Sequence, residues 1–152
     1  MKIAIVSASW HSDLMDAARE SCLKQLHALG IDAANGVDEF KVPGSLEIPL
    51  MAQKLALTKR YAGIICFGWI VDGGIYRHEF VSQAVIDGLV RVQLDTGVPV
   101  FSCVLTPKEF RECPEHLEFF RDHLIGKGRD VAAAAMKFIG VLATVEGTAP
   151  GA

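Results

Sequence analysis

Several features are absent from the sequence, and each absence excludes a class of protein. No apolar run in the 152 residues is long enough to cross a membrane, and the first residues lack the shape of a signal peptide. The four cysteines form no CxxC pair, and the five histidines form no HxxxH or HExxH pair, so we expect neither a disulfide framework nor a metal site. A GxGxxG fingerprint is also missing, which argues against a nicotinamide cofactor. We therefore expect a cytoplasmic protein.

The composition is that of one globular domain. Hydrophobic residues make up 51% of the chain and charged residues 22%, which is not typical of disorder. The net charge is −3, and no Lys/Arg cluster is dense enough to indicate a nucleic acid or a membrane surface as partner. We expect a single domain over residues 1–145 and a flexible tail over 146–152. The cysteines (Cys22, Cys66, Cys103 and Cys113) are interpreted mainly as small core residues.

Apolar runs typical of strands alternate with helical periodicities along the chain. Strands are predicted at 2–7, 31–42, 64–71 and 98–105, and helices at 12–29, 46–57, 77–96 and 129–145. Ser12 is expected to be an N-cap, and Thr106 to start a further helix that Pro114 interrupts or restarts. Strands joined through helices must run parallel with right-handed crossovers. The prediction is an α/β protein of three layers (αβα) with a four-stranded parallel, flavodoxin-like sheet.

The carboxyl ends of such strands open at one edge of the sheet, where ligands of open α/β sheets bind. Four segments should meet there, at 9–11, 44–47, 69–78 and 102–107. They offer the indoles of Trp10 and Trp69, the carboxylate of Glu47 and the imidazole of His78. This set suits a flat heteroaromatic ligand with hydroxyl groups, together with an anion at a helix N-terminus.

Each of these residues also has a purely structural interpretation. Trp10 could cover the sheet edge, and Glu47 could simply favour a helix start. The pair Gly73–Gly74 could serve only a tight turn, and a single histidine such as His78 is usually structural or solvated. The convergence of four segments on one edge favours the functional interpretation.

Four motifs at these positions resemble one family. Residues 42–49 read VPGSLEIP and resemble the VPGAxEIP motif of lumazine synthases, and residues 73–80 read GGIYRHEF and resemble the family's GAT-x-H segment with one additional residue. Residues 97–106 are similar to its fourth strand, and 127–133 to its KGxEAA helix start. The resemblance covers nearly the whole chain, and GGIYRH with Trp10 indicates the subgroup described as type II.

The resemblance implies a condensation reaction. In this family 5-amino-6-(D-ribitylamino)uracil joins 3,4-dihydroxy-2-butanone 4-phosphate through a Schiff base, phosphate elimination and ring closure, which gives 6,7-dimethyl-8-ribityllumazine for riboflavin biosynthesis. The resemblance implies no organic cofactor and no metal. It also implies self-association as a pentamer or a dimer of pentamers.

The resemblance implies a role for each residue at the edge. Trp10 corresponds to the aromatic that stacks on the pyrimidine, and Ser102 stands where a neighbouring subunit contributes an aromatic. The residues implied for the ribityl chain and the heterocycle are Ser45, Leu46, Glu47, Trp69, Ile70 and Val71.

The phosphate and the proton transfer are implied for the glycine turn and the helix after it. His78 corresponds to the proton-transfer histidine, and an imidazole titrates near working pH. Gly74 and Ile75 stand near the family's phosphate-binding amides. Arg77 could stabilise the leaving phosphate, or His116 or Arg121 could take the place of the family's phosphate-binding arginine.

Two other classes of function stay open at this point. A low-activity paralogue would bind flavins or lumazines or act as an assembly scaffold, and Ser102 in place of an aromatic slightly favours it. A flavodoxin or a phosphoacceptor receiver is a poorer match, because residues 7–10 are not a Ser/Thr-rich phosphate loop and Asp72 stands without clustered acidic residues. Phe119–Phe120 and the alanine-rich last helix could pack between subunits or complete the monomer core.

Overall fold

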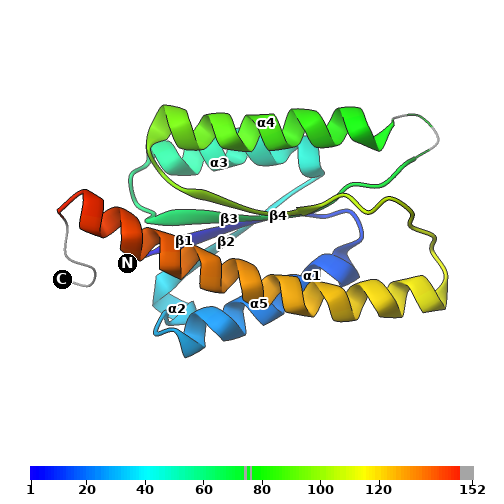
Figure 1. The fold of residues 1–152 in the computed structure, drawn as a ribbon, viewed down its shortest axis with the longest axis horizontal. Coiled ribbons are helices and arrows are strands. Elements are labelled where there is room, and N and C mark those ends of the chain that lie inside the picture. Colours follow the sequence, from blue (N-terminus) through cyan, green and yellow to red (C-terminus); the bar gives the residue numbers. More distant parts are fainter. Residues whose placement is uncertain (74, 76, 148–152) are drawn as a thin grey trace.

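A computed structural model of the chain describes residues 1–73, 75 and 77–147, and Figure 1 shows its fold. The elements in chain order are β1 (Ile3–Ala8), α1 (Ser12–Ala28), α2 (Ala33–Gly36), β2 (Val37–Val42), the 3₁₀ turn η1 (Ser45–Glu47), α3 (Ile48–Leu57), β3 (Gly63–Trp69), α4 (His78–Thr96), β4 (Val100–Leu105) and α5 (Pro114–Val145).

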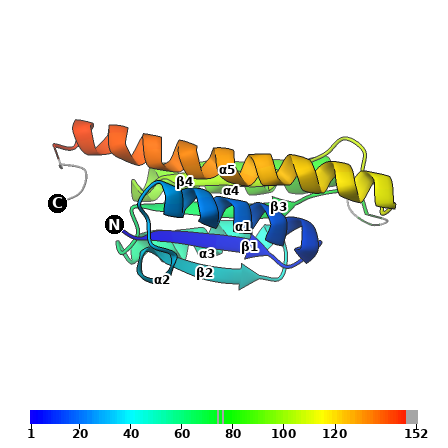
Figure 2. The ribbon, with the colours of Figure 1, turned by 90° about the horizontal axis from the view of Figure 1, so that it is seen from below.

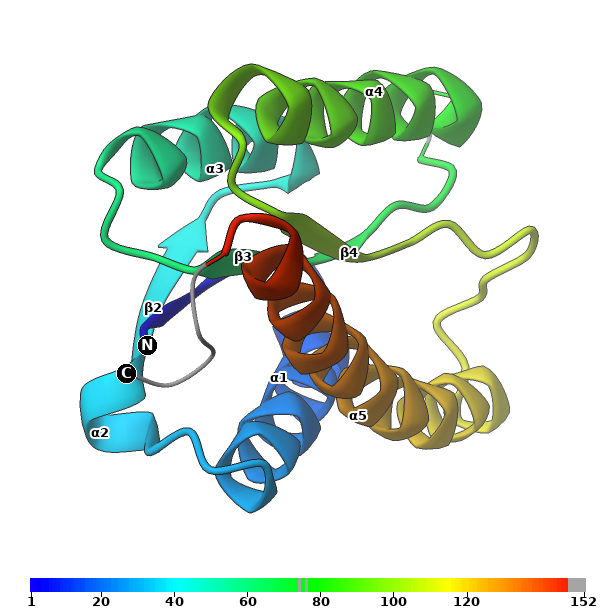
Figure 3. The same cartoon turned by 60° about the vertical axis from the view of Figure 1, so that its left-hand side comes forward.

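The four strands form one parallel sheet in the order β2-β1-β3-β4. Helices α3 and α4 cover one face, and α1 and α5 cover the other (Figures 1 and 3). The three-layer αβα prediction with a four-stranded parallel sheet is confirmed. This arrangement follows from right-handed crossovers, which send the chain to opposite faces when the strand order reverses between β1 and β3.

The two central strands are buried on both faces, as their apolar runs predict. Every residue of β1 and β3 is buried, and alternate side chains enter two separate cores. The core under α3 and α4 contains Ala4, Val6, Ile64, Cys66 and Val104, and the core under α1 and α5 contains Ile3, Ile5, Ile65, Phe67 and Trp69.

The buried cysteines confirm the prediction that they are core residues. Cys22, Cys66 and Cys103 are buried free thiols, and Cys113 is half-buried. Burial raises the pKa of Cys22 to about 12 and that of Cys103 to about 12, because the low-polarity core disfavours the thiolate. These thiols are therefore protonated and unreactive near neutral pH.

Helix α5 runs the length of the molecule and packs along α1 (Figure 2). The two helices approach closely where Gly128 faces the backbone of Ala18. A Cβ added to Gly128 would lie inside the contact radius of the Ala18 carbonyl oxygen and 2.9 Å from its carbonyl carbon. Only glycine permits this separation, because any side chain would have to displace main-chain atoms of α1.

The predicted strand at 31–42 starts too early. Residues 33–36 form the short helix α2 instead, where the Asp32 carboxylate accepts a hydrogen bond of 3.1 Å from the Ala34 amide. Strand β2 begins only at Val37. Local capping by aspartate therefore prevails over the weak apolar pattern around Ala34-Asn35-Gly36.

The predicted helix start at Thr106 is wrong, and so is the predicted start of the last helix near Arg129. The described chain between β4 and Pro114 has no helix, and α5 then runs without interruption to Val145. Phe110 from this segment packs edge-on against Trp69 at 5.3 Å between ring centroids. The long-range aromatic contact of Phe110 prevails over the local capping signal at Thr106. Helix α5 begins at Pro114 because the amides of a first helical turn have no partner within the helix, so the missing N–H of proline costs nothing there.

Smaller differences occur at other helix ends. Ser12 is the first residue of α1 and not its N-cap, which is His11 in the left-handed region at φ 51°. The predicted helix at 46–57 begins as the turn η1, and Pro49 lies in the first turn of α3 as expected. Helix α4 ends at Gly97 with φ 71°, which confirms its predicted end. Most of the predicted tail, at 148–152, lies outside the described residues.

Candidate active site

The carboxyl ends of all four strands open at one edge of the sheet, and the chain order reverses between the neighbouring strands β1 and β3. Helices α1 and α4 leave these two strands toward opposite faces (Figure 1). In open α/β sheets a ligand crevice lies at such a switch point. The segments that follow β1, β2 and β3 therefore form the candidate site.

The loop after β1 presents Trp10, the predicted stacking residue. Trp10 is 71% exposed, so its ring is free to contact a ligand. Ser9 anchors this loop, because its amide and hydroxyl both donate hydrogen bonds to the Val42 carbonyl, at 2.9 and 2.8 Å. His11 packs edge-on against Phe110 at 5.3 Å. These contacts hold the loop against the end of β2.

The turn after β2 places the predicted acid beside Trp10. The Gly44 amide donates a 2.8 Å hydrogen bond to Oε2 of Glu47. A Cβ at Gly44 would lie 3.2 Å from this oxygen and 4.0 Å from Nε1 of Trp10. The structure thus brings Trp10 and Glu47 together across Gly44, as the sequence predicts. Ser45 lies next to β3, because its Oγ would be 2.8 Å from a Cβ added to Gly68. The side chain of Leu46 is exposed.

Trp69, the second indole, is not exposed for stacking on a ligand as predicted. Trp69 is only 5% exposed and lies between Phe110 and Phe120, with ring centroids at 5.3 and 5.1 Å. Ile70 is buried in the opposite core, and Val71 is half-buried. In this arrangement the three residues could contact a heterocycle mainly through their backbone groups.

The start of α4 carries the predicted catalytic histidine. Oδ1 of Asp72 accepts a 2.8 Å hydrogen bond from the His78 amide and lies 2.8 Å from Nδ1 of the same residue. The second contact is short but bent, because the ring N–H is not directed at the oxygen and Nδ1 has no well-aligned partner. The amide and imidazole of His78 lower the pKa of Asp72 below its usual range. Asp72 is therefore an anion at neutral pH.

The remaining residues of this segment are open to solvent. Arg77 lies 3.6 Å from Glu79 and stacks over Phe80 at 5.3 Å from the guanidinium carbon to the ring centroid. Ile75 is 89% exposed. Gly74 lies outside the described residues. Arg77 is thus an exposed cation at the N-terminus of α4, an arrangement that suits a phosphate.

Ser102 and His116 lie away from these groups. Ser102 is exposed on edge strand β4, where its Oγ accepts a 3.2 Å hydrogen bond from the Val104 amide. Nδ1 of His116 accepts a 3.2 Å hydrogen bond from the Arg111 amide, and its ring packs near Phe120. Within the described part of the chain, no hydrogen bond or ion pair joins either residue to Trp10, Glu47 or His78.

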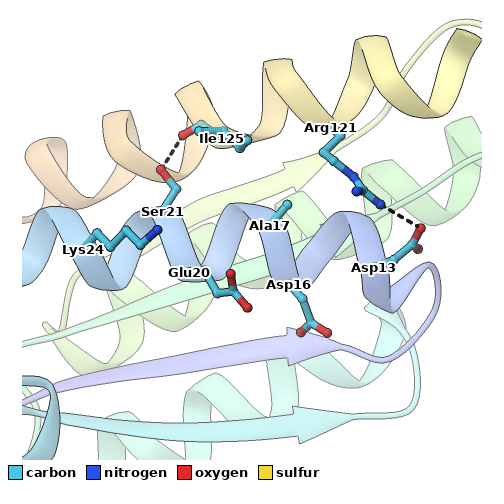
Figure 4. A pocket seen from close by; sticks show the side chains of 8 residues that line it. All are labelled: Asp13, Asp16, Ala17, Glu20, Ser21, Lys24, Arg121 and Ile125. Atoms are coloured by element: carbon cyan, nitrogen blue, oxygen red, sulfur yellow. Dashed lines mark hydrogen bonds and ion pairs between the residues drawn. The ribbon is translucent and has the colours of Figure 1, made fainter.

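Arg121 occupies a different surface. It lies 3.7 Å from Asp13 in a groove between α1 and α5, which Figure 4 shows. The groove has a volume of about 370 Å³ and is lined by six residues of α1, four of them charged, and by Arg121 and Ile125 of α5. It lies between the two outer helices and contains neither Trp10 nor His78. We therefore locate the chemistry at the sheet edge.

Asp72, His78 and Glu79 each offer one ligand atom within 4.8 Å of one another. Exposed acids commonly lie close together without an ion, and the capping of α4 already accounts for the Asp72–His78 contact. We therefore assign no metal to them. Among the described residues, no helix is both long enough and apolar enough to span a membrane.

Sequence reasoning missed Asp72 as the partner of His78 and Phe110 as the ring that encloses Trp69. Asp72 could have been suspected, because an aspartate that ends a buried strand shortly before a helix start is a natural acceptor for the first amides. Nothing local marks Phe110.

The fold and the site define a class: a parallel αβα protein with an exposed indole, a carboxylate and an acid-paired imidazole at its topological switch point. The sequence model of 6,7-dimethyl-8-ribityllumazine synthase matches residues 1–143. The chain is 52% identical over 133 residues to 6,7-dimethyl-8-ribityllumazine synthase of Rhodococcus erythropolis, which covers 88% of this chain and 85% of that protein. It is also 52% identical to 6,7-dimethyl-8-ribityllumazine synthase 2 of Bradyrhizobium diazoefficiens, over 88% of this chain and 79% of that protein. The chain belongs to the lumazine synthase family.

Proposed function

We propose that this protein condenses 5-amino-6-(D-ribitylamino)uracil with 3,4-dihydroxy-2-butanone 4-phosphate to 6,7-dimethyl-8-ribityllumazine in riboflavin biosynthesis. The observation that carries the proposal is the family match over residues 1–143, which includes every residue at the sheet edge. The described geometry supports it, because Trp10 and Glu47 lie together beside the switch point. Residues 1–145 would act as a single domain in the cytoplasm.

The pyrimidine would bind against the loop after β1. The exposed ring of Trp10 would stack on the heterocycle, and backbone groups of Trp69, Ile70 and Val71 would read its edge. Glu47 uses Oε2 for the Gly44 amide, so its other oxygen can accept ribityl hydroxyls. Ser45 and Leu46, the two residues before Glu47, would contact the ribityl chain as well. Holding both substrates in register would supply a large part of the rate enhancement.

The butanone phosphate would bind at the start of α4. Arg77 and the amides near Ile75, with Gly74 beside them, would hold the phosphate as it leaves. Imine formation between the pyrimidine amine and the ketone releases water, and loss of phosphate and ring closure each require protons to move. His78 would carry these protons as general acid and base. Its place at the first residue of α4 puts the imidazole next to the proposed phosphate site.

Self-association would complete the site. Large exposed apolar side chains lie on helices of both faces and are candidates for contacts between subunits; those on α3 and α4 include Leu50, Leu57, Phe80, Val90 and Leu94, and those on α5 include Phe119, Phe138, Val141 and Val145. A pentamer or a dimer of pentamers would cover them and would bring Ser102 and His116 toward a neighbouring site. In that setting His116 would be an additional phosphate contact.

The test is a direct assay of lumazine absorbance with both substrates, using the wild type, His78→Gln and His27→Gln. His27 is an exposed histidine at the end of α1 and serves as the matched control. We expect His78→Gln to lower kcat by at least about 100-fold, since general acid–base catalysis contributes roughly 100- to 10,000-fold. His27→Gln should retain full activity, and the mass in solution should be the same for all three. No product from wild type with active substrates would refute the function, and full activity of His78→Gln would remove His78 from the mechanism.

A second candidate function is flavin or lumazine binding by a low-activity paralogue. The observation in its favour is Ser102, a small residue where the family places an aromatic. This candidate predicts tight binding of lumazine with negligible turnover that does not change in His78→Ala. The absorbance assay and a fluorescence titration with lumazine separate the two functions.

A further inference from the structure

We propose that Asp72 is a positioning residue: it fixes both the start of α4 and the imidazole of His78, so that Nε2 faces the substrates. The proposal deepens the proposed function and rests on it for the role of His78 in catalysis. Asp72 itself need not touch either substrate.

The geometry of one oxygen carries this inference. Oδ1 of Asp72 accepts from the His78 amide at 2.8 Å and lies 2.8 Å from Nδ1 of the same residue. An amide N–H and an imidazole of one residue can share a single carboxylate oxygen only if the backbone and the ring are both held in one orientation. The side chain of His78 is mostly enclosed, at 17% exposure, so it has little room to choose another rotamer.

The electrostatics agree with this role. Nδ1 lies 2.8 Å from a carboxylate oxygen, which favours the tautomer with the proton on Nδ1, since a lone pair there would be repelled by the anion even though the N–H is not aimed at that oxygen. The neutral imidazole then keeps its lone pair on Nε2, where it can accept a proton from the pyrimidine amine or from the substrate carbon. The carboxylate also stabilises the imidazolium that forms after that transfer.

Other charges near His78 cannot replace Asp72. Glu79 is the next residue of α4 and lies 3.8 Å from Nδ1, but it also contacts Arg77. The turn η1 packs against α4, and its one charged residue, Glu47, is bonded to the Gly44 amide. Among the described residues, Asp72 is thus the anion closest to the imidazole.

The experiment compares Asp72→Ala, Asp72→Asn and a control, Asp95→Asn, each in wild type and in the His78→Gln background. Asp95 is an exposed carboxylate on the same helix, and within the described part of the chain its ion pair is with Arg91 at 3.2 Å. Asp72→Ala should lower kcat by about 10-fold or more, a part of the roughly 100- to 10,000-fold that general acid–base catalysis contributes, with KM changed less than about 2-fold. Asn keeps an acceptor oxygen, so Asp72→Asn should recover part of this loss.

The double variants separate positioning from helix capping. If Asp72 acts through His78, then Asp72→Ala should cost almost no further rate in the His78→Gln background, because residues that act as a unit are strongly non-additive. An equal loss of rate in both backgrounds would overturn the proposal, since Asp72 would then serve only the helix.

A readout on the free protein needs no turnover. In ¹⁵N spectra of the histidine ring, wild type and Asp72→Asn should show the Nδ1–H tautomer of His78, and Asp72→Ala should show a mixture with Nε2–H. An unchanged tautomer in Asp72→Ala would contradict the proposal even if the protein proved to be no synthase. A wild type without activity but with the expected tautomer shift would instead refute the proposed function alone.

Discussion

The close approach of α1 and α5 at Gly128 gives a stability prediction that can be worked from the structure. Replacing Gly128 by alanine adds one methyl group that meets the carbonyl group of Ala18, with 2.9 Å to its carbon and 3.1 Å to its Cα. These are main-chain atoms, so no side chain can rotate away. The helices must separate by a few tenths of an ångström or more, and the packing along their contact loosens.

The expected magnitude combines two opposing effects. Overpacking of a core costs typically about 1–3 kcal/mol, and we expect the upper end because the obstacle is backbone. Alanine is a better helix former than glycine by about 1 kcal/mol, which offsets part of this cost. The net expectation for Gly128→Ala is a loss of about 2 kcal/mol, which corresponds to a Tm lowered by about 4–8 °C in a domain of this size.

The same helix supplies the matched controls. Gly126 and Gly140 have no atom within 4 Å of an added Cβ, so Gly126→Ala and Gly140→Ala should gain about 0.5–1 kcal/mol. Thermal and urea unfolding of all three variants should be measured at one protein concentration, because association shifts the apparent stability. Equal stability of Gly128→Ala and Gly126→Ala would refute the reasoning about this helix contact.

Three further predictions concern the site and the sheet edge. Trp10→Ala should raise KM for the pyrimidine about 10- to 100-fold, since stacking on an aromatic ring contributes about 1–3 kcal/mol, while Trp10→Phe should retain most of the binding and neither variant should change the Tm. Gly68→Ala places a methyl group 2.8 Å from Oγ of Ser45 and should raise KM more than it lowers kcat, as steady-state kinetics would show. Asp38→Asn should lower stability at neutral pH, because hydrogen bonds from Tyr61 and Lys2 lower the pKa of Asp38. That stability is present above the ordinary aspartate pKa of about 3.9 and is lost as the pH falls through the lower folded pKa, so urea midpoints of wild type and variant should keep their gap at neutral pH and converge only below about pH 5.

Each of these predictions has a clear contrary outcome. Unchanged pyrimidine binding by Trp10→Ala would show that its ring does not stack on the substrate. Equal kinetics of Gly68→Ala and Gly126→Ala would show that Ser45 is not displaced or does not bind substrate. A constant gap between wild type and Asp38→Asn across the pH range would show that ionisation of Asp38 does not contribute to stability.

The sequence predicts the fold well because strands buried on both faces, β1 and β3, appear as uninterrupted apolar runs. The segments between the strands show the periodicity of helices. The order β2-β1-β3-β4 comes from the structure, and with that order the face of each crossover helix follows from right-handed connections. The four segments at the sheet edge are predicted for the same reason, since parallel strands end on the same side. Of the expected site, the structure brings Trp10 and Glu47 together, and it places His78 at the helix start as predicted.

The misses arise where distant contacts prevail over local signals. The capping sequence at Thr106 starts no helix, because the ring of Phe110 in the same segment packs on Trp69. The alternation of side chains along β3 does predict that Trp69 points into the core, because Trp69 shares the face of Ile65 and Phe67. The prediction that it stacks on a ligand considered only that it is an indole. An aspartate shortly before a helix start is a local signal for the contact of Asp72 with the His78 amide, but nothing in the sequence indicates that the same oxygen also meets the imidazole.

The two hydrogen bonds from Ser9 to the single carbonyl of Val42 have a mechanical consequence. They hold the start of the loop that carries Trp10 to Val42, two residues before Gly44. The proposed stacking residue Trp10 and the proposed hydroxyl-binding acid Glu47 therefore lie on segments that are anchored to each other, so their backbones should move together. Ser9→Ala removes one of the two anchoring hydrogen bonds and should weaken binding of the pyrimidine more than binding of the phosphate substrate.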